Sequence, residues 1–163
     1  MNDENLSELD ILNKLINYQI SSNSIPVDEN LSQYIYNAIK ELGIVEKCRI
    51  SLKTAKKPIG DVVVPECETC EYFEKFIPNC TNIDYPNTRV LSINTQNGEY
   101  GFIALKFFKC CSEPILHAFQ NFATLIAINI ENYLHKQQIE NQYNDLINYK
   151  KQLESIVQER TEE

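Results

Sequence analysis

The residues in this chain with the clearest chemical potential are its six cysteines. Cys67 and Cys70 form a Cys-x-x-Cys pair, and Cys80 follows ten residues later. Two intervening residues allow both thiolates to reach one tetrahedral ion from a single turn of chain. Further ligands would come from Cys110 or Cys111, so these five cysteines form a candidate site for zinc or an iron–sulfur cluster.

Other interpretations of the cysteines remain open. The first alternative is that the cysteines are buried or unreactive thiols. The second is a thiol–disulfide switch, and the third and least favoured is ligation of haem. Glu66, Glu68 and other acidic neighbours surround the Cys-x-x-Cys pair and raise thiol pKa values, which favours a bound cation over a fast redox switch. Cys48 alternates with polar residues on an expected strand, which predicts a small core residue.

Several aromatic residues lie near the cysteines in the sequence and are candidates for lining a small-molecule pocket. The alternative is that they are ordinary core residues. The set is Tyr72, Phe73, Phe76, Tyr100 and Phe102.

Composition excludes several classes of function. The 163 residues carry a net charge of −8, which argues against nucleic acid or an anionic membrane surface as a partner. No apolar run is long enough for a membrane span. The acidic start, Met1 to Asn5, lacks the features of a secretory signal, so a cytoplasmic location is expected.

The elements that must position these residues can be read from periodicity and end signals. Apolar residues at three- and four-residue steps between Leu6 and Ile20 predict a first helix, in which Ser7 and Asp10 either form a capping box or lie inside the first turn. A second helix is expected between Asp28 and Gly43. The remaining expected elements are strands at 47–53, 61–64, 89–95 and 100–108, with an Asn97-Gly98 hairpin and a short helical segment at 67–76.

From Glu113 to the end, the sequence predicts one long helix. Its first part has an apolar stripe at Ile115, Phe119, Phe122, Ile126, Ile130 and Tyr133. Its last part follows a heptad that predicts a coiled-coil seam. The seam residues are Ile139, Tyr143, Leu146, Lys150, Leu153, Val157 and Arg160. The alternative is a solvent-exposed helix without a partner, which would be marginal in water.

This order of elements predicts an α+β fold, an antiparallel sheet with terminal helices on one face and a long C-terminal coiled-coil helix. The segment from Val90 to Ile93 and the segment from Asn97 to Leu105 resemble the strand–hairpin–strand of the GAF domain family. The resemblance implies a GAF/PAS-like sensor domain over residues 1–135. A Pro that is usual in the first of these strands is missing. So are the cyclic-nucleotide and bilin signatures of the family.

The segment from Leu153 to Glu163 resembles the linker that joins sensor domains to output modules in sensor histidine kinases. That resemblance implies a coiled-coil signalling linker over residues 136–163. Neither His117 nor His135 has the context of a phosphoacceptor, so no catalysis is expected of this chain.

The sequence-based hypothesis is therefore a cytoplasmic sensory domain of a two-component signalling protein. It would sense a small ligand or a redox or metal state through the cysteine-containing pocket. It would form a homodimer through its N-terminal and C-terminal helices and relay the signal along the latter. Two other classes remain open, a thiol enzyme of the methionine-sulfoxide-reductase kind and a purely structural dimerisation module.

Overall fold

The fold comes from a computed structural model, which describes residues 7–61, 63 and 87–162. Two compact units are present, Met1–Ile130 and Glu131–Glu163. The described elements follow the order α1 (Glu8–Ser22), α2 (Glu29–Glu41), β1 (Val45–Leu52), β2 (Ile59–Gly60), β3 (Thr88–Asn94), β4 (Glu99–Phe107) and α3 (Glu113–Thr161). The fold class is thus α+β, as predicted.

Sequence signals fix the ends of the first two helices. Ser7 and Asp10 form the predicted capping box at the start of α1, each side chain meeting the other residue's backbone N–H. Asp28 caps α2, and its carboxylate accepts a hydrogen bond from the Asn30 N–H at 2.8 Å. Gly43 follows α2 with φ +72°, the left-handed conformation in which glycine is favoured.

The described strands form one antiparallel sheet in the order β2-β1-β4-β3. The hairpin between β3 and β4 closes where Asn97-Gly98 predicts it, and the Thr95 N–H donates to the Gly98 carbonyl at 2.8 Å. Gly101 in β4 has φ +150°, and a Cβ at this position would overlap the Ser51 carbonyl of β1. Glycine is therefore required for the close approach of these two strands.

The second strand was predicted at 61–64, and the structure places it at Ile59–Gly60. Asp61 and Val63 lie outside it, and residues 62 and 64 are not described. Gly60 pairs with Arg49 at φ +114°, where a Cβ would overlap the Cys48 carbonyl. Within the described residues, pairing with β1 therefore begins two residues before the predicted strand, at a glycine that allows the close backbone contact.

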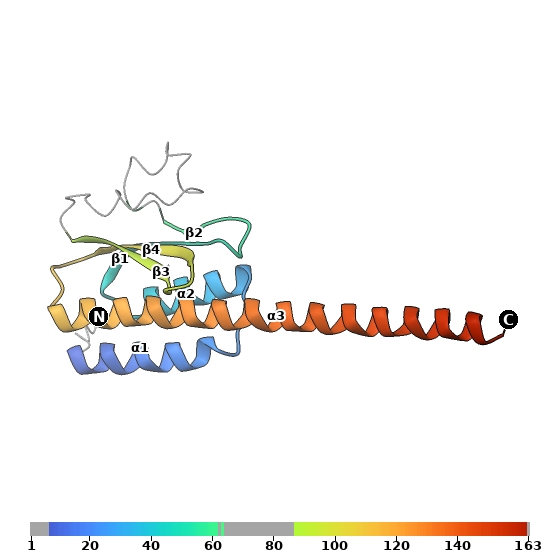
Figure 1. Cartoon of the computed structure of the whole chain (residues 1–163). Coiled ribbons are helices and arrows are strands. Elements are labelled where there is room, and N and C mark those ends of the chain that lie inside the picture. Colours follow the sequence, from blue (N-terminus) through green and yellow to red (C-terminus); the bar gives the residue numbers. More distant parts are fainter. Residues whose placement is uncertain (1–6, 62, 64–86, 163) are drawn as a thin grey trace. The chain divides into compact units, whose positions relative to one another are not determined.

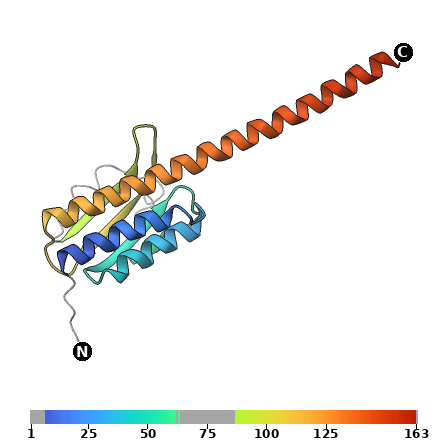
Figure 2. The same ribbon diagram turned by 90° about the horizontal axis from the view of Figure 1, so that it is seen from below.

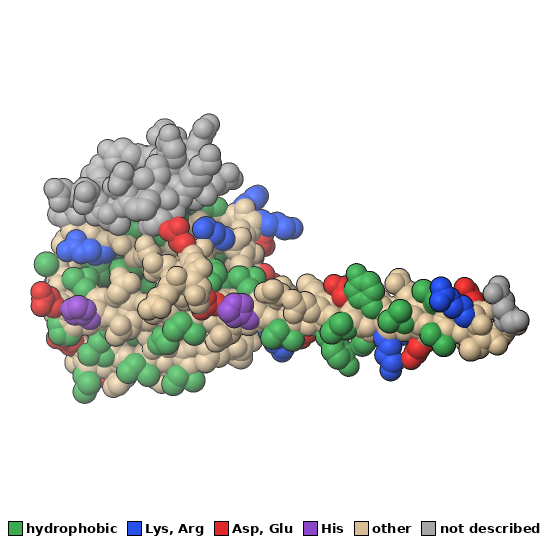
Figure 3. Space-filling view, in the orientation of Figure 1, with side chains coloured by type: hydrophobic (Ala, Val, Ile, Leu, Met, Phe, Trp, Pro, Cys, Tyr) green, Lys and Arg blue, Asp and Glu red, His purple; other side chains and the backbone are tan. Residues whose placement is uncertain are grey.

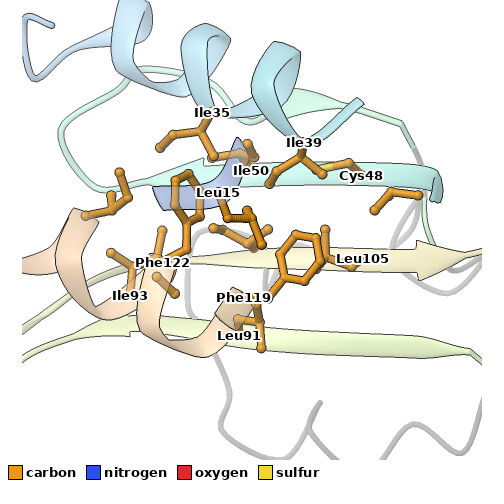
Figure 4. Packing of buried hydrophobic residues seen from close by; sticks show 14 of the residues in the cluster. Leu15, Ile35, Ile39, Cys48, Ile50, Leu91, Ile93, Leu105, Phe119 and Phe122 are labelled. Atoms are coloured by element: carbon orange, nitrogen blue, oxygen red, sulfur yellow. The ribbon is translucent and has the colours of Figure 1, made fainter. Parts of the chain in front are cut away.

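Within the first unit, α1, α2 and the early turns of α3 lie on one face of the sheet (Figures 1 and 2). Their apolar side chains meet those of β1, β3 and β4 in one main core, of which Figure 4 shows the centre. Phe119 and Phe122 are fully buried there, as the predicted stripe on the long helix requires. Phe119 stacks edge-on against Phe107 with ring centroids 5.5 Å apart.

Helix α1 runs parallel to the early part of α3 and is hydrogen-bonded to it at both ends. The Ser112 hydroxyl, just before α3, donates to the Glu8 carboxylate at 3.0 Å. At the other end, the Asn129 amide donates to the Ser22 hydroxyl at 3.1 Å. These contacts fix the register of the two helices.

Candidate functional site

The predicted cysteine site falls largely on residues that the structure does not describe. Cys67, Cys70 and Cys80 lie outside the described residues, whereas Cys110 and Cys111 lie in the connection between β4 and α3. Within the described part of the chain, no three His, Cys, Asp or Glu side chains are grouped closely enough to hold a metal ion. The described residues thus contribute at most two neighbouring thiols to the predicted zinc or iron–sulfur site.

These two thiols differ in their environments. Cys110 is exposed, whereas Cys111 is partly buried against the main core. Burial raises the pKa of Cys111, the adjacent Cys110 raises it further, and Arg89 lowers it. At neutral pH, Cys111 is therefore held mainly as the protonated thiol, and Cys110 is the more accessible of the pair.

Cys48 is a core residue, as its alternation in β1 predicted. It is fully buried, beside Ile39 and Leu105 in the view of Figure 4. Burial raises the pKa of its thiol to about 12, with a further contribution from Asp61 that Lys40 partly offsets. This thiol is unsuited to redox or metal chemistry because it is neither accessible nor ionised.

Of the five aromatic residues predicted to line a pocket, the structure describes only Tyr100 and Phe102. Tyr72, Phe73 and Phe76 lie outside the described residues. Tyr100 is partly buried and packs against the main core. Phe102 is also buried, but it alternates with Ile103 and therefore shares with Ala104 the sheet face opposite the helices. On that face, Val63 and Val90 pack against Ala104 as a second, smaller apolar cluster.

A polar cluster around Asp61 was not expected from the sequence. The Asp61 carboxylate accepts hydrogen bonds from the Cys48 N–H at 3.2 Å and from the Tyr36 hydroxyl at 3.5 Å. The Lys40 ammonium lies 3.5 Å from the same carboxylate and donates to the Glu46 carbonyl at 2.7 Å. Asp61, which follows β2, is thereby hydrogen-bonded to both β1 and α2.

The interactions around Asp61 stabilise the fold. Burial and the Asp61 charge raise the pKa of Tyr36, so its hydroxyl stays protonated and donates to the carboxylate. The pair of Lys40 and Asp61 is about one-third exposed, so its contribution to stability is at most about 1 kcal/mol. The available sequence signal was the basic residue in the last turn of α2, but nothing in the sequence pointed to its partner.

An exposed apolar surface of the first unit lies on α1 and the early part of α3. Leu9, Ile16 and Ile20 on α1 are exposed, as are Leu125 and Ile128 on α3. Figure 3 shows hydrophobic side chains gathered over these helices. Helix α1 therefore has two apolar faces, one in the core through Ile11 and Leu15 and one on the surface.

A cleft of about 560 Å³ lies between these helices. Its walls are mainly apolar, with His117 and three neutral polar side chains. The lining residues are Leu12, Leu15, Ile16, Gln19, Pro114, His117, Ala118, Asn121, Thr124 and Leu125. Exposed apolar residues on two adjacent helices are typical of a surface that binds another protein.

The second unit, Glu131–Glu163, consists of the remainder of α3. Most of its large apolar side chains are exposed within this single chain, and Ile147 is half-buried. The exposed ones are Tyr133, Leu134, Ile139, Tyr143, Leu146, Tyr149, Leu153, Ile156 and Val157. None of the helices in the described part of the chain has the length and apolar character needed to cross a bilayer.

Comparison with known proteins does not identify a family. No protein-family model matches the chain, and a search of curated proteins finds no match.

Proposed function

We propose that this chain is a dimeric sensory module of a signal-transduction protein. The observation that carries the proposal is the exposed row of apolar side chains on α3 beyond residue 131, which recurs with a heptad period. A single helix of this kind is marginal in water, and pairing with a second copy would bury the row.

The first unit supplies the sensory part of the proposal. Its antiparallel sheet carries helices on one face and the buried Phe102 and Ala104 on the other. This arrangement is compatible with the GAF-like resemblance of the strand–hairpin–strand segment, which implies a ligand pocket on the sheet. The exposed apolar residues of α1 and early α3 extend the proposed dimer contact to the N-terminal helix.

We further propose that the signal is a small molecule or a redox or metal state acting through Cys67, Cys70, Cys80, Cys110 and Cys111. Exposure of Cys110 immediately before α3 supports this, because chemistry at that point acts directly on the start of the long helix. Zinc or an iron–sulfur cluster would be the cofactor, and haem is less favoured. The module would act in the cytoplasm within a two-component protein whose catalytic part is separate from this chain.

Sedimentation of the full 163-residue chain tests the dimer. The wild type should be dimeric, and Leu153→Asp should weaken the dimer by about a hundredfold or more because a charge enters a buried seam. Lys151→Asp is the matched control, since it changes charge two residues away outside the proposed contact. A wild type that remained monomeric at all concentrations would overturn the proposal.

Elemental analysis and absorbance of anaerobically purified protein test the signal. Stoichiometric zinc or iron that is lost in a Cys110→Ser, Cys111→Ser variant would support a site including these thiols. Metal-free protein whose sedimentation is also indifferent to thiol oxidation would remove the metal and redox parts of the proposal.

A further inference from the structure

The second unit carries two overlapping seams on the same helix. Both use Ile139, Leu146, Leu153 and Arg160, which recur every seven residues, so Arg160 does not distinguish the seams. Seam A, the one predicted from the sequence, adds Tyr143, Lys150 and Val157 at four-residue steps. Seam B adds Gln142, Tyr149 and Ile156 at three-residue steps. A two-stranded coiled coil places only one of these sets in its core.

Exposure within one chain does not favour seam A. Tyr149 and Ile156 of seam B are 66% and 48% exposed, and Tyr143 and Val157 of seam A are 64% and 61% exposed. Both seams therefore present an aromatic and a β-branched residue to solvent. The choice depends on the polar residue that each seam would bury and the other would not.

Those polar residues differ in what their burial costs. Seam A places the Lys150 ammonium in the core, whereas seam B places the neutral Gln142 amide there. Removing a charge from water costs more than removing an amide that retains hydrogen-bonding partners. Lys150 also lies 3.7 Å from Glu154 of its own helix, an ion pair that is solvent-exposed at present. Seam B leaves that pair at the margin of the contact.

Charge at the margins of seam B also defines an orientation. With Leu146 and Tyr149 in the core, Asp145 and Lys150 occupy the two flanking positions. In a parallel, in-register pair these positions face each other across the contact, five residues apart in sequence. In an antiparallel pair, each flanking position faces the same heptad position of the other helix. At the centre of the contact, Asp145 would then face Asp145 of the other copy and Lys150 would face Lys150.

We propose that the second unit pairs with a second copy of this chain in parallel and in register through seam B. Asp145 of each copy then forms an ion pair with Lys150 of the other copy. This inference rests on the proposed dimer and specifies its seam and direction. By sequence count, Leu125 and Ile128 fall on the same two heptad positions as Leu146 and Tyr149, although the proposal concerns residues 131–161 alone.

Two tyrosines provide a matched test of the seam, since they are almost equally exposed in one chain. Tyr149→Glu should weaken dimerisation of the full chain by about thirtyfold or more, and Tyr143→Glu by less than about fivefold. The measurement is the dimer dissociation constant from sedimentation equilibrium, with circular dichroism to check that each variant stays helical. The reverse order of effects would establish seam A and overturn the proposal while leaving the proposed dimer intact.

A charge exchange tests the direction. Asp145→Lys and Lys150→Asp should each weaken the dimer by about threefold to tenfold, because each variant places like charges opposite one another. The double variant should recover most of the loss, whereas Asp145→Lys combined with Lys151→Asp should recover none. Absence of recovery in the Asp145–Lys150 double variant would overturn the parallel arrangement, and a monomeric wild type would instead overturn the proposed function.

Discussion

Helix α3 contains two stretches that each carry a row of apolar side chains but lie in opposite environments. In the first unit, Phe119, Phe122 and Ile126 are fully buried by the rest of the domain. In the second unit, Leu146 and Leu153 are more than 60% exposed. The comparison teaches that apolar spacing identifies a face to be buried but does not say which chain buries it.

The largest expected effect comes from removing a large apolar side chain from each stretch in turn. It tests whether only the first stretch stabilises the domain. Phe119→Ala should lower the free energy of unfolding by about 3–5 kcal/mol, because it removes a buried ring and leaves a cavity. Leu153→Ala should change the stability of the first unit by less than about 0.5 kcal/mol while weakening the dimer. Urea unfolding followed by tyrosine fluorescence, together with sedimentation, separates the two effects. Equal losses of domain stability would contradict the distinction between the stretches.

Two glycines of the first unit, Gly101 and Gly43, give a test in which the expected loss of unfolding free energy is smaller. Gly101→Ala should cost about 2–4 kcal/mol, because it adds a Cβ against the Ser51 carbonyl to an unfavourable φ. Gly43→Ala has a positive φ but open space around its Cβ, so about 1 kcal/mol is expected. Urea titration of both variants measures the difference. Neither change should reduce dimerisation through the second unit, and a loss of the dimer in Gly101→Ala would show that the two units depend on each other.

The last expected effect is a pH dependence of stability to which the buried Cys48 thiol contributes. The folded-state pKa of Cys48 is about 12, against an ordinary value of 9.0, so the folded chain holds this proton more tightly than the unfolded chain. The resulting stabilisation is complete below about pH 9 and is lost as pH rises toward about 12. In Cys48→Ala, the decline of the urea midpoint above about pH 9 should be shallower than in the wild type. Identical declines would mean that this thiol does not ionise on unfolding in that range.

The sequence predicted those parts of the fold that depend on local signals. The capping box at Ser7, the cap at Asp28 and the Asn97-Gly98 hairpin all depend on neighbouring residues, and the structure confirms each. The pairing of Ile59 and Gly60 with β1 was not predicted, because the close approach of Gly60 to the Cys48 carbonyl involves residues distant in sequence. The ion pair of Lys40 and Asp61 was also not predicted, because these two residues are distant in sequence.

The candidate sites were predicted less completely than the fold. The sequence placed Cys48 correctly in the core because alternation in a strand reports burial. The same alternation separates Phe102 from the helix-covered face, but spacing alone could not show that Tyr100 packs against the core. Nor could it distinguish between the two seams of the second unit, because residues three and four positions apart share a helix face.

The paired hydrogen bonds at the ends of α1 have a mechanical consequence. Sliding α1 along the early turns of α3 would break the Glu8–Ser112 and Ser22–Asn129 contacts together, whereas moving both helices as one body would break neither. Translation of one helix past the other is therefore the motion that these two hydrogen bonds resist. A displacement imposed at the start of α3 would carry α1 with it and leave the spacing of their exposed apolar residues unchanged.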